Sequence, residues 1–80
     1  MRDRTSERII AETAALLAAA RKKKGLSYQA LADIAGVHRT SISLIERGRL
    51  SPTLLVCLKI ARALDVDLTD LIKKARKAAQ

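Results

Sequence analysis

The chain has 80 residues, with 16 Lys and Arg against 8 Asp and Glu, which gives a formal net charge of +8. This length predicts a single domain over residues 1–80, and one Tyr with no Phe or Trp argues against RNA binding by base stacking. The positive charge attracts a polyanion such as duplex DNA, RNA or an anionic membrane, unless it forms only a solvated surface that keeps the chain soluble.

The chain has one cysteine and one histidine, which argues against a disulfide-linked protein, a metal-binding protein and an enzyme. Cys57 is the only cysteine, so we expect a buried structural thiol and neither an internal disulfide nor a Cys-based zinc site. His38 is the only histidine and has no second ligand nearby, so no metal is expected. No nucleophile–base pair or Gly-rich phosphate loop indicates an enzyme or a cofactor. Residues 1–7 are polar, unlike a signal peptide, and no apolar run reaches the ~20 residues that span a bilayer, so we expect a reduced cytoplasmic protein.

The first predicted helix covers residues 6–24. Ser6 can cap its beginning, and Gly25 ends it after a Lys-rich last turn. Thr13 interrupts the apolar face, which predicts shallower burial near the start of the helix. The apolar stripe at helical spacing consists of Ile9, Leu16, Leu17 and Ala20.

Two short helices follow. The first covers residues 28–35, is capped by Ser27, and is expected to point Leu31 and Ile34 inward before it ends at Gly36. The next covers residues 39–47, with a cap at His38 or a neighbour, and ends at Gly48.

The carboxyl-terminal part of the chain predicts two more helices. Ser51 as the cap and Pro52 as the first helical residue begin one of them, and Asp67 can cap the other. The expected inner residues are Leu54, Cys57, Leu58, Ala61 and Leu64 of the former and Leu68, Leu71 and Ile72 of the latter. No alternating strand pattern occurs, so the sequence predicts an all-α, compact five-helix domain.

Residues 28–47 predict a helix-turn-helix. Two short helices that cross steeply need a small residue where they touch, which Ala32 supplies, and a residue that tolerates positive φ in the turn, which Gly36 supplies. Val37, Ile42 and Ile45 are then expected to fix the second of these helices to the core.

Over about residues 17–72 the sequence resembles the lambda-repressor-like, or XRE-type, helix-turn-helix family. Among the matching elements are Leu31-Ala32, Gly36-Val37, Ile45-Glu46-Arg47-Gly48 and Leu68-Thr69-Asp70-Leu71. The resemblance implies a lambda-repressor-like DNA-binding domain whose recognition helix, residues 39–47, enters the major groove. In size and in the stretch His-Arg-Thr-x-Ile-Ser the chain is similar to restriction–modification controller proteins, while an antitoxin or a small phage repressor fits almost as well.

The resemblance also implies which residues contact DNA. Arg39 is the best candidate for reading a base, because its guanidinium can donate two hydrogen bonds to guanine. Leu44 either contacts a thymine methyl or is a partly exposed or subunit-facing leucine. Tyr28 stands where similar proteins usually have Gln, so it either donates to phosphate or packs on the helix. The candidate DNA contacts are Tyr28, Gln29, His38, Arg39, Thr40, Ser41, Ser43, Leu44, Arg47 and Arg49.

Similar repressors pair the glutamate of this Glu-x-Gly element with an arginine on the first helix, which implies a structural ion pair between Arg21 and Glu46. We expect a regulator that acts as a homodimer on an inverted-repeat operator, because one recognition helix contacts few bases. The competing function is a protein-interaction module, for instance for a toxin or RNA polymerase, with secondary DNA binding; membrane association is not expected. Two dimer surfaces are predicted, one with Val66, Leu68, Ile72 and Ala75, the other with Ile9, Ile10 and Ala14.

Overall fold

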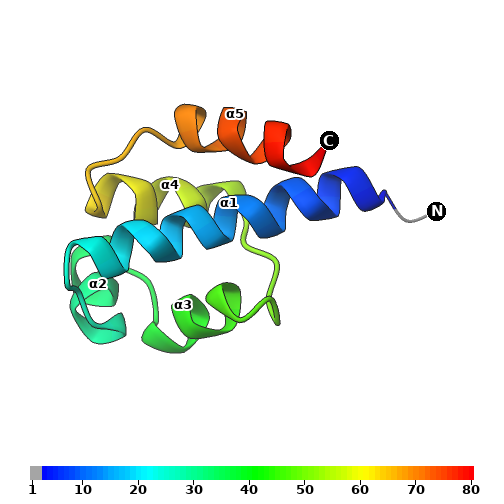
Figure 1. The fold of residues 1–80 in the computed structure, drawn as a ribbon. Coiled ribbons are helices and arrows are strands. Elements are labelled where there is room, and N and C mark those ends of the chain that lie inside the picture. The colour runs from blue at the N-terminus through cyan, green and yellow to red at the C-terminus, as the bar shows by residue number, and fades with distance from the viewer. Residues whose placement is uncertain (1–2) are drawn as a thin grey trace.

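The computed structural model describes residues 3–80 and consists, over that range, of five helices without a strand (Figure 1). Met1 and Arg2, at the beginning of the polar amino-terminal segment, lie outside the described residues. The predicted all-α fold is confirmed. The helices are α1 (Arg4–Lys23), α2 (Tyr28–Ala35), α3 (Arg39–Glu46), α4 (Leu54–Ala63) and α5 (Leu68–Ala79).

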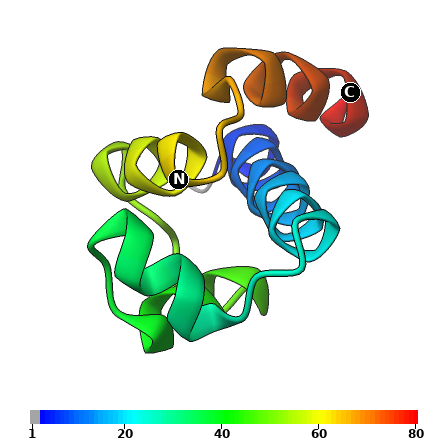
Figure 2. The same ribbon diagram turned by 90° about the vertical axis from the view of Figure 1, so that its left-hand side faces the viewer.

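The helices form three layers, which Figures 1 and 2 show from two directions. α1 and α4 make the middle layer, α5 lies on one side of it, and α2 and α3 lie on the other side. α1 packs against both α5 and α3, and α4 packs against both α2 and α5. The middle layer therefore separates α5 from α3, and these two helices face opposite sides of the molecule.

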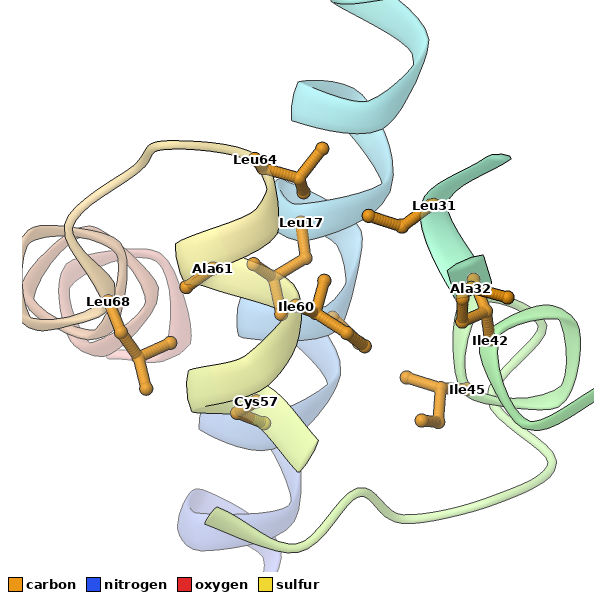
Figure 3. Close-up of a cluster of buried hydrophobic side chains, with 11 residues drawn as sticks. Leu17, Leu31, Ala32, Ile42, Ile45, Cys57, Ile60, Ala61, Leu64 and Leu68 are labelled. Atoms are coloured by element: carbon orange, nitrogen blue, oxygen red, sulfur yellow. The ribbon is translucent and has the colours of Figure 1, made fainter. Parts of the chain in front are cut away.

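The core forms where α1 and α4 meet the helix-turn-helix (Figure 3). Leu31, Ile42 and Leu64 are almost completely buried, and Leu17 and Ile60 lie among them. Full burial of such a side chain stabilises the fold by about 1.5–3 kcal/mol. The predicted inward positions of Leu31 and Ile42 are confirmed.

Local hydrogen bonds cap the beginnings of α2 and α5 as predicted. Ser27 Oγ accepts a hydrogen bond from Ala30 N–H at 3.0 Å, and Asp67 Oδ1 accepts one from Thr69 N–H at 2.9 Å. The cap of α1 is Asp3, not Ser6, because Asp3 Oδ1 accepts the Ser6 N–H at 3.0 Å and Oδ2 accepts its hydroxyl at 2.7 Å. These hydrogen bonds with Ser6 lower the pKa of the Asp3 carboxyl group.

The start of α4 also differs from the prediction. Its cap is Thr53, whose Oγ1 accepts the Val56 N–H at 3.1 Å, and Ser51 and Pro52 belong to the preceding connection. Both Ser51-Pro52 and Thr53 can begin a helix, and the structure uses Thr53.

Three expected core positions are exposed. Ile34, Leu54 and Leu58 face solvent, while Ile60 is buried instead. The first half of α4 is apolar on all sides, so periodicity cannot identify its inner face, and packing against α2 and α5 decides it. Thr13 shows the opposite error, since it is buried; its hydroxyl donates to the Ile9 carbonyl at 2.7 Å, which satisfies the polar group within the helix.

Candidate nucleic-acid interface

The helix-turn-helix is built from two eight-residue helices joined at Gly36. Gly36 has φ of 72° and ψ of 36°, the left-handed conformation that the sequence predicts for the turn. Ala32 is buried where α2 and α3 pack together, and Ile42 and Ile45 fix the inner side of α3 to the core. The opposite side of α3 is left facing outward at one edge of the molecule (Figure 1).

None of the ten candidate DNA contacts is buried. The exposed ones are Gln29, His38, Arg39, Thr40, Arg47 and Arg49, and the half-buried ones are Tyr28, Ser41, Ser43 and Leu44. An open hollow of about 320 Å³ brings five of them together, and these are Tyr28, Arg39, Thr40, Ser43 and Arg47. The fold therefore joins side chains from the start of α2 to the outward face of α3.

Gln29 and His38 do not line this hollow, whereas Arg47 does. Gln29 Nε2 donates to Asp33 Oδ1 at 2.7 Å, which ties the amide to its own helix. His38 occupies the cap position of α3 but forms no side-chain cap hydrogen bond, so its imidazole remains exposed. Arg47 Nε donates weakly to the Ser43 carbonyl at 3.4 Å, which leaves the terminal nitrogens of its guanidinium at the surface.

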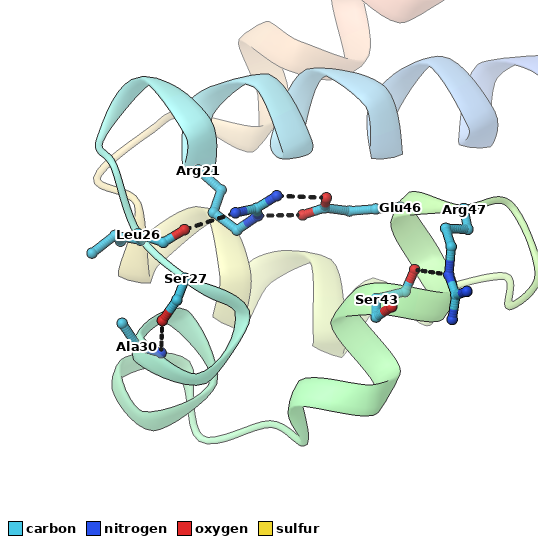
Figure 4. A network of polar contacts seen from close by, with 7 residues as sticks. All are labelled: Arg21, Leu26, Ser27, Ala30, Ser43, Glu46 and Arg47. Atoms are coloured by element: carbon cyan, nitrogen blue, oxygen red, sulfur yellow. Dashed lines mark hydrogen bonds and ion pairs between the residues drawn. The ribbon is translucent and has the colours of Figure 1, made fainter.

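The ion pair that the resemblance implied is present and fixes the end of α3 (Figure 4). Arg21 Nε donates to Glu46 Oε2 at 2.7 Å and Nη2 donates to Oε1 at 3.0 Å, so the ion pair is bidentate. The side chains are only 11% and 10% exposed. The hydrogen bond to Glu46 is the main cause that raises the pKa of Arg21 above its usual value, so the guanidinium stays charged.

Arg21 has two further contacts that sequence reasoning missed. Nη1 donates to the Leu26 carbonyl at 2.7 Å, and the guanidinium carbon lies 4.4 Å from the centre of the Tyr28 ring. Such a cation–π contact needs spatial proximity that no local sequence signal reveals. Arg21 thus holds together the end of α1, the connection to α2, the Tyr28 ring and α3.

Two groups of basic side chains lie on opposite faces of the molecule. Arg39, Arg47 and Arg49 belong to the helix-turn-helix face, whereas α5 carries a basic group on the other side of the middle layer. All members of that group are exposed, and they are Lys73, Lys74, Arg76 and Lys77. A single duplex held by α3 cannot also contact α5, so only part of the net charge acts on it.

The predicted dimer surfaces need a correction. Leu68 and Ala75 are buried within the single chain, where α5 packs on α1, so they are not free to contact a second copy. Val66 and Ile72 are half-buried against the core, and Ala14 is buried. The two surfaces that the sequence suggested are therefore packed together, and of their members Ile10 is exposed while Ile9 and Ile72 are half-buried.

Cys57 and His38 carry no reactive arrangement within the described chain. Cys57 is buried, as predicted, and burial raises the pKa of its thiol, so it is protonated at neutral pH. Among residues 3–80, no three His, Cys, Asp or Glu side chains gather in a way that could hold a metal ion. No helix in the same range is both long and apolar enough to span a membrane.

Comparison of the sequence with known proteins shows the family to which this chain belongs. The pattern of the helix-turn-helix family HTH_3 matches residues 17–71. An "Uncharacterized HTH-type transcriptional regulator" of Methanothermobacter thermautotrophicus is 48% identical over 44 residues, which are 55% of this chain and 64% of the relative. A protein of the same description from Archaeoglobus fulgidus is 37% identical over 51 residues, 64% of this chain and 73% of the relative. The chain thus spans less than two thirds of the first relative and somewhat more of the second. Because the family match covers more than half of the chain and contains α2, the turn and α3, this protein is a member of the XRE-type helix-turn-helix family.

Proposed function

We propose that this protein is a sequence-specific regulator of transcription that binds duplex DNA as a homodimer on an inverted-repeat operator, with α3 in the major groove. The observation that carries the proposal is the hollow lined by Tyr28, Arg39, Thr40, Ser43 and Arg47. Arginine and hydroxyl side chains on an outward helix are the donors that base edges and phosphates accept. Both relatives are named as transcriptional regulators, which agrees with this role.

Some side chains of the helix-turn-helix contact DNA bases, and others contact the phosphates of the DNA backbone. Arg39 and Thr40 lie in the first turn, which reaches the base edges in a docked helix-turn-helix. Arg39 reads a guanine, Thr40 a base edge or a thymine methyl, and half-buried Leu44 offers apolar contact to a thymine methyl. Phosphates are held at the periphery by Tyr28 and Arg49, and further phosphate contacts come from Gln29, His38, Ser41, Ser43 and Arg47.

A homodimer supports useful specificity because one short recognition helix contacts few bases. Two copies related by a two-fold axis read two half-sites about one helical turn, ~34 Å, apart, and the operator repeats the symmetry of the protein. A monomer with three or four base contacts would bind many genomic sites with similar affinity.

The direct test is selection of bound sequences from a random duplex pool at about 150 mM salt, since lower ionic strength increases non-specific binding. We expect enrichment of an inverted repeat with a guanine in each half-site. Binding without enrichment would contradict sequence-specific recognition, and enrichment of a single half-site would contradict the homodimer.

Replacing Tyr28 separates its two roles. Tyr28→Phe keeps a ring under Arg21, so the free energy of unfolding is expected to stay within about 0.5 kcal/mol of the parent, whereas Tyr28→Ala loses about 1–2 kcal/mol. Tyr28→Phe removes the hydroxyl and is expected to weaken operator binding by roughly two- to tenfold, the value of one hydrogen bond. Urea unfolding and operator titration measure the two effects. Unchanged operator affinity in the Phe variant would restrict Tyr28 to packing.

A further inference from the structure

An apolar surface remains open where the first half of α1 meets the connection between α3 and α4. Two adjoining hollows of about 340 and 230 Å³ lie there, and both are lined by Ile10 and Pro52. Leu50 lines the larger hollow and Leu54 lines the smaller one. We call this continuous surface, with Ile10, Leu50, Pro52 and Leu54, the α1–α4 groove.

Three large aliphatic side chains of the groove are exposed. Leu54 is 66% exposed, and Ile10 and Leu50 are exposed as well. Contiguous exposed aliphatic side chains of this kind mark interaction sites in soluble proteins. Ile9 and Ile72, which complete the wall of the smaller hollow, are half-buried and already held in place by the fold.

The charge distribution identifies the kind of partner. Residues 50–58 contain no charged side chain, although Lys, Arg, Asp and Glu make up 30% of the sequence and the net charge is +8. A second copy carries the same net charge and is repelled by the basic faces, so it approaches most readily at this apolar surface, where Glu7 is the one charged residue that lines the two hollows. An acidic protein or a nucleic acid would instead be attracted to the exposed Lys and Arg side chains.

The shape of the groove fits a two-fold interface. Such an interface uses the same patch on both copies and must therefore contain both a projecting group and a hollow to receive it. Leu54 projects beside the hollow of about 230 Å³ that it helps to line. A cavity of about 150 Å³ accepts a benzene molecule, so the hollow has room for a leucine side chain from the partner.

The groove lies beside the carboxyl-terminal end of α3. Its larger hollow is also lined by Ile45 and Gly48 at the end of α3, so the groove adjoins the recognition helix. Figure 1 shows the α3–α4 connection below the first half of α1, and residues of both segments line the larger hollow.

We propose that the α1–α4 groove is the dimer interface, in which Leu54 of each copy enters the smaller hollow of the other. The inference rests on the proposed homodimer and deepens it by naming the surface. A stable complex buries ~1,200–2,000 Å², and few side chains line the groove, so we expect the free dimer to be weak and the operator to complete its assembly.

The interface is tested by sedimentation equilibrium of the full chain without DNA, at concentrations between about 1 and 500 µM. The parent is compared with the Leu54→Glu variant. We expect at least about tenfold weaker self-association, because the substitution places a charge in both symmetric contacts. The matched control is Leu55→Glu, a neighbour that is 62% exposed and lines neither hollow, and it is expected to self-associate like the parent. Leu54→Ala, without a new charge, is expected to give a smaller loss, and thermal unfolding checks that each variant folds.

Several results would overturn the proposal. A parent that stays monomeric over this range and binds the two half-sites independently would show that the groove serves another partner. Equal effects of the Leu54 and Leu55 variants, or no effect of either, would place the interface elsewhere. Binding of each variant to an isolated half-site is measured in parallel and is expected to be unchanged. If the parent binds no DNA at all, the proposed function fails while sedimentation still decides the interface.

Discussion

The Arg39→Ala variant is expected to bind the selected operator about 5- to 150-fold more weakly than the parent, because an arginine–guanine contact contributes about 1–3 kcal/mol of discrimination. Arg39 is the first residue of α3, is exposed, and lines the hollow on the helix-turn-helix face. Titrations use the operator and a version in which the contacted guanine is replaced. The parent is expected to distinguish the two duplexes, and the variant is expected to bind both with similar affinity.

Arg76→Ala is the matched control for this prediction. It removes the same exposed side chain from α5, on the opposite side of the middle layer, so operator affinity and selectivity are expected to be nearly those of the parent. Equal losses in both variants would mean that net charge, and not base contact by Arg39, governs binding. If the Arg39 variant loses affinity but keeps its preference for guanine, Arg39 contacts a phosphate and not a base.

The Glu46→Gln variant is expected to lose about 3 kcal/mol of the free energy of unfolding, because the Arg21 guanidinium is left largely buried without its charged partner. The whole free energy of unfolding of a domain of this size is roughly 4–12 kcal/mol, so the expected loss is a large part of the stability. The melting temperature falls by about 4–8 °C per kcal/mol in a domain of this length. Operator affinity also falls, since Glu46 anchors the end of α3 to α1.

Two further variants give this prediction its controls. Asp33→Asn makes the same acid-to-amide change at an exposed pair within α2, and its effect is expected to stay below about 0.5 kcal/mol. The double variant Arg21→Met/Glu46→Met removes both charges and is expected to be more stable than Glu46→Gln alone, because no unpaired charge is buried. Thermal and urea unfolding measure all three. A Glu46→Gln variant that unfolds and binds like the parent would contradict the structural role of the pair.

Features that depend on a few neighbouring residues could be predicted from the sequence. Ser27 and Asp67 cap their helices through hydrogen bonds to N–H groups two or three residues later, and Gly36 adopts the left-handed turn because it has no side chain. The amphipathic spacing of Ile42 and Ile45 likewise determined the inner side of α3. The ion pair between Arg21 and Glu46 joins distant positions, and it was inferred from the resemblance to a family.

The sequence by itself determined the five helices, the turn, the outward row of α3 and the excess of positive charge, because each depends on local propensity or simple composition. Only the tertiary structure decided which apolar residues are buried, because α4 and the end of α2 offer more such residues than the core can accept, so Ile34 and Leu54 remain outside. It also placed the Tyr28 ring against Arg21, the basic side chains of α5 opposite α3, and α1 against α5, and the last of these contacts buries Leu68 and Ala75 of the predicted dimer surface. These outcomes depend on how whole helices pack, a property that no single segment encodes.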